Sequence, residues 1–443
     1  MKLIVIGGVA AGMSAASKLK RVNQDAEIVV YEKGNYLSYG ACGLPYFVSG
    51  ENADYKKMVM RTREQFEQMG MKINTRHEVV KVDPEKKQVM IKCLTEGTLF
   101  LDSYDKLVIA TGATPIRPPF EGMNLKNIFV LKTIEDGISI KEAVEHQSVK
   151  NVVVVGAGYI GIEVVEAMVH RGKNVRLIEL GKRILTPFDS EITDLAEAHL
   201  KDKGVAFNLG ERVERFHGTE TVTAVQTDQG VYEADLVVLA VGVTPATAFL
   251  KETGINLAAN NAIIIDREMR TNLKDIYAAG DCAQVYHKVM EENAYLPLGT
   301  TANKCGRILG GNLNGARQKY VGTLGSAAIK VCDLELGRTG LSEDEAKKQA
   351  IDYTTVFVET KDHPPYYPNA TPIWIKLLCE KGTKRILGAQ TIGNKGAVLR
   401  VDIFAVAIHN NMTAPELGMT DLVYAPPFAG VWDAVHIASN AVK

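Results

Sequence analysis

VVVVGAGYIGIEVVEAMVHRGKNVRLIE, residues 152–179, decides the fold that we expect for this chain. Four valines predict a buried strand, and Gly156, Gly158 and Gly161 follow them as a complete G-x-G-x-x-G turn. A helical stretch then leads to a second strand that ends at Glu179. Strand, glycines, helix, strand and acid in this order predict a βαβ unit that binds a dinucleotide.

The N-terminus carries a second unit of the same kind. An apolar run at residues 3–6 precedes GGVAAG, which extends from Gly7 to Gly12, and EIVVYE then ends at Glu32. Gly7 would make the tight turn, Gly12 would let the helix pack closely, and the N-terminal end of that helix would attract a pyrophosphate. Val9 stands in place of the middle glycine, so an ordinary tight turn remains the alternative here.

The acids at the two strand ends predict which nucleotides bind. Glu32 would bind ribose hydroxyls, whereas Glu179 would bind a 2′-hydroxyl and repel a 2′-phosphate. This favours NADH, although the nearby Lys182 and Arg183 would also allow NADPH. Two nucleotide units in one chain indicate that electrons pass between two cofactors.

Two shorter segments favour a flavin as one of these cofactors. DKLVIATGATP, residues 105–115, and DIYAAGDCA, residues 275–283, each read as a strand that ends in a turn of small residues. The second ends at Gly280 and Asp281. An aspartate at such a turn commonly accepts a hydrogen bond from a hydroxyl of the flavin's ribityl chain. Alone, Asp281 would be an ordinary turn residue, but beside two glycine turns it favours FAD.

A single cysteine follows the first unit. Cys42 lies within SYGACGLPY, residues 38–46, and Phe47 stands where a second cysteine would complete a CxxxxC pair. Cys42 must therefore form a mixed disulfide, a persulfide or a sulfenic acid with a molecule from outside. Reaction as a thiolate needs a lowered pKa, which we expect from the N-terminus of a helix at CGLPYFV and from the flavin.

The ordered motifs GGVAAG, SYGACGLPY, ATGATP, GAGYIG and AAGDCA, followed by YYP and YAPPF, span the chain. Together they resemble the single-cysteine pyridine nucleotide–disulfide oxidoreductases, and most of all the coenzyme A disulfide reductases among them. The resemblance implies an α/β fold with two Rossmann-like domains, for FAD and NAD(P)H, and a C-terminal α+β domain that forms a homodimer. The implied FAD domain comprises residues 1–113 and 246–322, the NAD(P)H domain 114–245, and the dimerisation domain 323–443.

The resemblance also implies where the cofactors bind. FAD would contact Gly7, Gly8, Ala11, Gly12, Glu32, Lys33, Val80, Ala110, Thr111, Gly112, Gly280, Asp281, Thr301 and Ala302. NADH would contact Gly156, Gly158, Tyr159, Ile160, Gly161, Glu179 and Gly242. Tyr159 would cover the nicotinamide face of the flavin until NADH displaces it, although a packed aromatic beside a turn is the ordinary alternative.

The same resemblance implies that the flavin reduces a disulfide between Cys42 and coenzyme A (CoA). CoA carries phosphates, so its site should be basic. The implied CoA contacts are Lys18, Arg21, Ser38, Asn303 and Arg307. Lys18 and Arg21 share one helix face at i, i+3 spacing, and simple solvation of that face is the alternative. Ala41 replaces an asparagine that the family often has before the cysteine, so strict specificity for the CoA disulfide stays open.

Two late tyrosines complete the site that the resemblance implies. Tyr366 in HPPYYPNA and Tyr424 in LVYAPPF match tyrosines that reach the active site of the other subunit in this family. Their hydroxyls would bind the substrate sulfur or protonate the departing thiolate. Tyr367 is adjacent to the first of them and remains an alternative.

Four alternative functions stay open. NADH peroxidase and NADH oxidase usually have a histidine in the first glycine turn, but Ala10 and Ala11 stand here, which disfavours the peroxidase. Reduction of a CoA persulfide, polysulfide or sulfur would use the same cysteine. Many such reductases add a rhodanese domain, and the chain ends at Lys443 without one. A non-enzymatic redox sensor is the most remote alternative, because no basic groove or additional tail is visible.

Composition excludes several other classes. With 46% hydrophobic and 23% charged residues and a net charge of −1, the chain has no general attraction to nucleic acid. No apolar run approaches the ~20 residues that cross a membrane. The six cysteines lack CxxC spacing, which fits a cytoplasmic enzyme, and no cluster of residues predicts a metal site.

Overall fold

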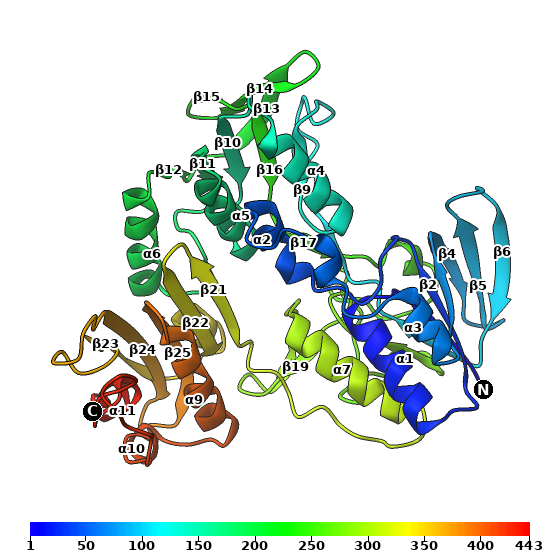
Figure 1. Cartoon of the computed structure of the whole chain (residues 1–443). Helices are drawn as coiled ribbons and strands as arrows, with labels where there is room; N and C mark the ends of the chain where they lie inside the picture. The colour runs from blue at the N-terminus through cyan, green and yellow to red at the C-terminus, as the bar shows by residue number, and fades with distance from the viewer.

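The N-terminal βαβ unit builds a sheet of five parallel strands in the computed structural model, which describes residues 1–443 (Figure 1). Their order is β18-β7-β1-β2-β3. The strands are β1 (Lys2–Ile6), β2 (Glu27–Glu32), β3 (Lys72–Thr75), β7 (Lys106–Ile109) and β18 (Ile276–Ala278). The last strand comes from far along the chain, so two distant segments share one sheet.

Helices α1 (Ala10–Val22) and α7 (Gly299–Asn312) pack directly against each other beside this sheet. Small residues let their backbones approach closely. A Cβ on Gly306 would lie 2.4 Å from the carbonyl oxygen of Ala11, and one on Gly310 would lie 2.4 Å from that of Ala15. The outer residues of the two helices are therefore held at a fixed spacing.

The second βαβ unit builds a matching sheet of five parallel strands in the order β12-β11-β10-β16-β9. The strands are β9 (Ile128–Val130), β10 (Asn151–Val155), β11 (Asn174–Glu179), β12 (Ala206–Leu209) and β16 (Leu236–Leu239). The helices of this part are α4 (Ile134–Glu145), α5 (Tyr159–His170) and α6 (Ser190–Asp202). In both sheets the strand before the glycine turn lies in the centre.

Smaller antiparallel sheets accompany the two parallel ones. The chain passes from the first sheet to the second in β8 (Ala113–Pro115) and returns in β17 (Val243–Pro245), and these two strands pair with each other. The remaining small sheets contain β4 (His77–Asp83), β5 (Gln88–Cys93), β6 (Leu99–Ser103), β13 (Val213–Gly218), β14 (Val222–Thr227), β15 (Val231–Glu233), β19 (Val285–His287) and β20 (Glu292–Ala294). Two short helices, α2 (Leu44–Ser49) and α3 (Arg63–Gln68), precede β3.

An antiparallel sheet in the order β21-β22-β25-β24-β23 forms the C-terminal part (Figure 1). Its strands are β21 (Ala327–Val331), β22 (Leu334–Gly340), β23 (Tyr353–Lys361), β24 (Pro372–Glu380) and β25 (Ile386–Gly393). Its helices are α8 (Glu343–Lys348), α9 (Ala397–His409), α10 (Ala414–Leu417) and α11 (Ala434–Asn440). The predicted fold class, two Rossmann-like units and a C-terminal α+β part, is confirmed. None of the helices combines the length and the apolar character needed to cross a membrane.

Candidate active site

The two glycine turns have the same backbone geometry. Gly7 and Gly156 both have φ of +103°, a conformation that favours glycine. A Cβ on Gly12 would lie 2.0 Å from the carbonyl oxygen of Gly7, and one on Gly161 would lie 1.9 Å from that of Gly156. Each last glycine therefore lets a helix start directly against the turn, with its first N–H groups facing the place of a pyrophosphate.

The acid at the end of each second strand is fixed in the same way. Glu32 Oε2 accepts a hydrogen bond from the N–H of Gly8 (2.7 Å), and its Oε1 accepts one from the N–H of Gly34 (2.7 Å). Glu179 Oε2 accepts a bond from the N–H of Ala157 (2.7 Å). Both carboxylates thus lie beside a glycine turn, where the ribose of a bound nucleotide would meet them.

Val9 does not disturb the first turn. It precedes α1 with φ of −103°, and Gly158 precedes α5 with φ of −76°. Both values suit any residue, so the backbone needs no glycine at either position. The alternative of an ordinary turn is disfavoured, because Gly7, Gly12 and Glu32 reproduce the geometry of the second unit.

The segments predicted to contact FAD converge on the first turn. A Cβ on Gly7 would lie 2.1 Å from the carbonyl oxygen of Ala110, which brings residues 110–112 against the turn. A Cβ on Gly280 would lie 3.0 Å from the Cβ of Ala11 and 3.7 Å from that of Ala302. These small residues let the three segments meet at the carboxyl ends of the strands, which is where a dinucleotide binds in this type of sheet, so the arrangement fits FAD.

Two predicted FAD contacts lie after β2 and on β4. Lys33 follows β2 and forms an ion pair with Glu78 (3.7 Å) on β4. Val80 is the bulged residue of β4, between Val79 and Lys81 in the pairing with β5. A bulge redirects a residue away from the regular strand pattern, which supports a contact outside its own small sheet.

Cys42 is exposed in a single 3₁₀ turn (Ala41–Gly43) directly before α2. Although the residue reaches solvent, the surrounding protein atoms raise the pKa of its thiol, and the charges of Glu163 and Asp281 raise this pKa further. Lys132 acts in the opposite direction. The protein residues alone therefore give the Cys42 thiol a raised pKa, so burial outweighs the lowering expected from the helix N-terminus, and the lowering expected from the flavin stays a prediction.

The predicted substrate contact Ser38 is held beside the first glycine turn. Its N–H donates to the carbonyl oxygen of Gly8 (2.9 Å), and its own carbonyl oxygen accepts a bond from the N–H of Met60 (2.8 Å). Ser38 has φ of +47°, an uncommon conformation for a residue other than glycine. The loop that ends at Cys42 is thus tied to the nucleotide turn that precedes it.

Sequence analysis missed two charged residues that act on Cys42. Lys132 lies between β9 and α4, and its Nζ is 3.5 Å from Oδ2 of Asp281. Glu163 on α5 has a pKa of about 7, raised first by burial and then by the charge of Glu166. Lys132 could not be predicted because it belongs to no motif. Glu163 stands two residues after Gly161, but nothing in the composition of its helix distinguishes it from other helical glutamates.

The predicted CoA residues of α1 and α7 lie on adjacent helices. Asn303 Oδ1 accepts a hydrogen bond from the hydroxyl of Ser14 (3.1 Å), and Arg307 is exposed one turn beyond it. Lys18 and Arg21 lie on α1, and neither they nor Arg307 form an ion pair. Three cations without acidic partners on two packed helices are available for a phosphate-bearing ligand.

The two late tyrosines meet each other. The hydroxyls of Tyr366 and Tyr424 are 3.0 Å apart and share a hydrogen bond, which raises the pKa of Tyr366. Both are exposed, at 72% and 46% of their surface. The ring of Tyr367 instead lies edge-on to His363, with centroids 5.6 Å apart. The structure therefore selects Tyr366, rather than Tyr367, as the partner of Tyr424.

Tyr159 lies at the first position of α5, directly after the second glycine turn. Its ring is edge-on to Phe188 (centroids 6.1 Å apart), and burial raises its pKa to about 12. The residue as a whole is half-buried. Gly242, which follows β16, has φ of +109°.

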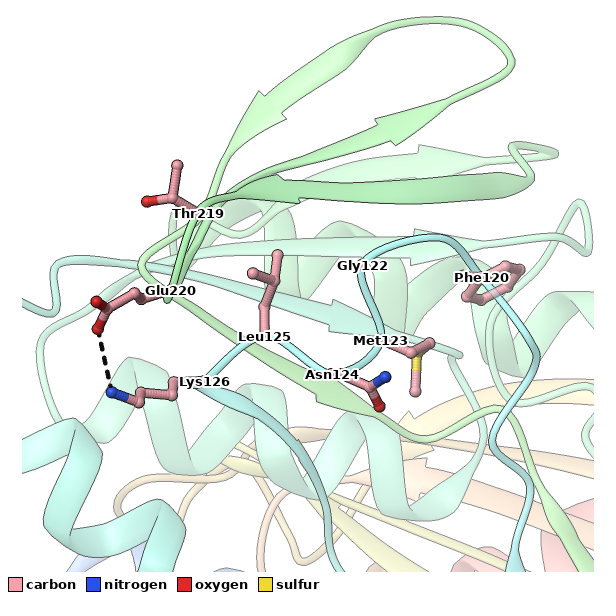
Figure 2. A pocket seen from close by; sticks show the side chains of 8 residues that line it. All are labelled: Phe120, Gly122, Met123, Asn124, Leu125, Lys126, Thr219 and Glu220. Atoms are coloured by element: carbon pink, nitrogen blue, oxygen red, sulfur yellow. Dashed lines mark hydrogen bonds and ion pairs between the residues drawn. The ribbon is translucent and has the colours of Figure 1, made fainter.

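A surface hollow lies apart from all of these residues (Figure 2). It is formed by residues 120–126 and the turn between β13 and β14, and an ion pair between Lys126 and Glu220 (3.2 Å) crosses its rim. It contains neither a cysteine nor a histidine. We therefore assign it no part in the chemistry.

Comparison with known proteins identifies the class. The family model for pyridine nucleotide-disulphide oxidoreductases matches residues 1–295, and the model for the dimerisation domain of that family matches residues 326–435. The chain belongs to the pyridine nucleotide-disulphide oxidoreductases, and its C-terminal sheet is their dimerisation domain.

Individual relatives agree with the subgroup that the motifs resemble. The NAD(P)H coenzyme A polysulfide/persulfide reductase of Pyrococcus horikoshii is 38% identical over the whole chain, which covers 98% of that protein. The coenzyme A disulfide reductase of Staphylococcus epidermidis is 28% identical, with 98% of both chains covered. The solved structure of the water-forming NADH oxidase from Lactobacillus brevis bound to NADH is 33% identical. It has a TM-score of 0.96, with 100% of this chain and 98% of that chain covered. The predicted resemblance is confirmed.

Proposed function

We propose that this chain is an NAD(P)H-dependent flavoprotein that reduces a CoA-linked disulfide or persulfide through Cys42. The observation that carries this proposal is one exposed cysteine, without a partner cysteine, beside two matching nucleotide turns. FAD bound in the first cradle would supply two-electron transfer from the nicotinamide to a disulfide at Cys42. The chain's own residues bind the nucleotides, hold the thiol and orient the sulfur substrate.

The covalent step can be written for either substrate. The Cys42 thiolate attacks one sulfur of a CoA disulfide, the sulfur–sulfur bond breaks, and one CoA thiolate leaves and takes up a proton. Two electrons and a proton then convert the Cys42–CoA mixed disulfide to the Cys42 thiolate and CoA thiol. With CoA persulfide, attack on the sulfur bonded to CoA releases hydrosulfide and gives the same mixed disulfide. The 38% identity to the Pyrococcus reductase favours the persulfide or polysulfide as a second substrate.

The proposed CoA site follows the outer residues of α1 and α7. Lys18, Arg21 and Arg307 would bind phosphates of CoA, and Asn303 would contribute its amide. Their support is the absence of acidic partners on two closely packed helices. Ser38, held next to the first glycine turn, would lie near the thiol end.

The first test is the mass of the intact chain, purified and denatured without reductant. An adduct of one CoA that is lost on reduction and absent from Cys42→Ser would support the proposal. An added oxygen on Cys42 would favour peroxide or oxygen reduction, and an added sulfur would favour sulfur reduction. A bare thiol in every preparation would contradict a resting enzyme that carries CoA.

The tyrosine pair is proposed to act across the dimer. Tyr366 and Tyr424 of one subunit would reach the Cys42 of the other, where one hydroxyl protonates the leaving thiolate. The shared hydrogen bond supports them as a unit, because it holds one hydroxyl as a donor toward the other.

Removal of either hydroxyl is expected to slow disulfide reduction. Tyr366→Phe and Tyr424→Phe should each lower kcat with CoA disulfide by about 100-fold, the usual contribution of a positioned acid. Tyr367→Phe is the matched control and should keep the activity of the unchanged protein. Steady-state kinetics measure the effect, and equal loss in all three variants would argue against the pair.

Glu179 is expected to set the preference for NADH. Glu179→Gln removes one negative charge beside the place of a 2′-phosphate and should raise kcat/KM for NADPH relative to NADH by roughly tenfold. Glu32→Gln makes the same substitution in the first unit and should leave this ratio unchanged. The ratio of the two kcat/KM values is the measurement, and an unchanged ratio in Glu179→Gln would place the selectivity elsewhere.

The proposed domains follow from the crossing strands. Residues 1–113 with 246–322 would hold FAD, residues 114–245 would hold NAD(P)H, and residues 323–443 would form the dimer. The pairing of β8 with β17 at both crossings supports the first two limits. All six cysteines are free, which supports a proposed location in the cytoplasm.

A further inference from the structure

Two exposed loops, one with Tyr366 and the other with Tyr424, share a buried anchor. Arg400, on α9, is only 8% exposed. Its Nη2 donates to the carbonyl oxygen of Asp362 (2.7 Å), where the first loop begins, and to that of Phe428 (3.3 Å) in the second loop. One side chain therefore fixes the backbone of both loops at once.

Asp433 holds this guanidinium in place. Nε and Nη2 of Arg400 donate to its carboxylate at 3.0 and 2.8 Å, and Nη1 donates to the carbonyl oxygen of Gly396 (3.3 Å). Asp433 also begins α11, because its carboxylate accepts the N–H of Val435 (2.9 Å). The anchor is thus connected to two helices that pack on the C-terminal sheet.

Each loop is also closed at its base. In the first loop, Oδ1 and Oδ2 of Asp362 accept bonds from the N–H and the hydroxyl of Thr371, both at 2.9 Å. In the second, Nδ1 of His436 accepts the N–H of Asp433 (3.2 Å), so Nε2 carries the proton and donates to the carbonyl oxygen of Thr420 (2.9 Å). Tyr424 lies between the fixed positions Thr420 and Phe428.

The phenols cannot position themselves. Their exposed rings have no apolar core to pack against, yet their hydroxyls meet at 3.0 Å. The bonds at the base of each loop fix that loop alone, whereas Arg400 contacts the backbones of both loops. Arginine suits this role because its planar group carries five donors in a rigid fork, whereas lysine has three donors on one atom.

We propose that Arg400 is a positioning residue that holds Tyr366 and Tyr424 in the geometry required for disulfide reduction. The proposal rests on the function proposed above for the tyrosine pair. In this proposal, Arg400 contacts neither the substrate nor a cofactor, and it acts only through the backbone of the two loops. Its removal should therefore affect the step that uses the tyrosines and no other step.

Arg400→Lys is the informative variant, because it keeps a cation beside Asp433 but cannot reach both loops. We expect kcat for CoA disulfide to fall by about tenfold or more, the effect of a small displacement of a reacting group. The rate of flavin reduction by NADH, followed by stopped-flow absorbance without disulfide, should not change. Arg385→Lys is the matched control in the same C-terminal part: Arg385 lies in the turn between β24 and β25, pairs with Glu380 (3.2 Å), and its replacement should leave both rates unchanged.

A double-mutant cycle separates positioning from general damage. If Arg400 acts through the pair, Arg400→Lys should cost almost nothing further in a Tyr424→Phe background. Thr371→Val, which removes the hydroxyl bond at the base of the first loop, should lower kcat for CoA disulfide by a smaller factor. This variant replaces Arg400→Lys in the test if Arg400→Lys does not fold.

Four results would overturn the proposal. Losses that multiply in the cycle, or equal slowing of flavin reduction, would show that Arg400 has only a structural role. Normal kcat in folded Arg400→Lys, together with slow Tyr424→Phe, would reject the anchor and leave the tyrosine function standing. A fully active Tyr424→Phe would reject the tyrosine function and the anchor together.

Discussion

Cys42→Ser is expected to abolish reduction of a CoA disulfide by NADH, with a loss of roughly 10⁴-fold or more, because serine cannot form the mixed disulfide. Flavin binding and flavin reduction by NADH should persist, since neither depends on the thiol. The residue is exposed in a short turn, and its replacement removes no buried contact that the fold requires. Turnover of CoA disulfide with NADH, beside stopped-flow reduction of the flavin, measures the two steps separately.

Cys332→Ser provides the matched control. Cys332 is also a free cysteine, half-buried at the turn between β21 and β22, and burial raises its pKa to about 11. Its replacement should leave turnover unchanged. Substantial CoA disulfide reduction by Cys42→Ser would contradict the covalent route. Oxygen consumption that survives in this variant would instead reveal a flavin reaction that needs no cysteine.

Gly161→Ala is expected to be the most damaging small substitution in the second unit. The new methyl would lie 1.9 Å from the carbonyl oxygen of Gly156, so either α5 or the glycine turn must move. We expect the free energy of unfolding of this part to fall by about 3 kcal/mol or more. NADH should bind about 100-fold more weakly, because the displaced turn no longer faces the pyrophosphate.

Gly158→Ala is the comparison for this variant. Gly158 has φ of −76° and no protein atom within 4 Å of an added Cβ, so alanine there should leave the thermal unfolding midpoint unchanged. Differential scanning calorimetry and titration with NADH measure the two effects. Equal stability of both alanine variants would show that the turn yields more readily than its close contacts indicate.

The glycine turns could be predicted from sequence because they are governed by the backbone. A positive φ at Gly156 and a close backbone approach at Gly161 exclude other residues, so the glycine pattern in the sequence predicts the turn. Val9 shows the limit of such a pattern. The residue at the middle position directly precedes the helix and has an ordinary φ, so residues other than glycine are accepted there.

Interactions between distant side chains could not be predicted in this way. The resemblance indicated Tyr366 and Tyr424, but their shared hydrogen bond depends on two loops 58 positions apart. No sequence pattern marked Arg400, because an arginine within a helical stretch looks the same in the sequence whether its side chain is buried or exposed. The pKa of Cys42 depends on Glu163, Asp281 and Lys132, which the fold brings together from three segments.

The ribbon of β8 and β17 has a consequence for ancestry. Because these strands pair, the two ends of the second nucleotide unit touch where they meet the first. A domain whose two ends lie side by side can be inserted into another domain without distorting the fold of either one. The two units also share the φ of their first glycine and the hydrogen bonds of their acids. Duplication of an ancestral gene segment, followed by insertion of one copy into the other, is the simplest history that fits both facts.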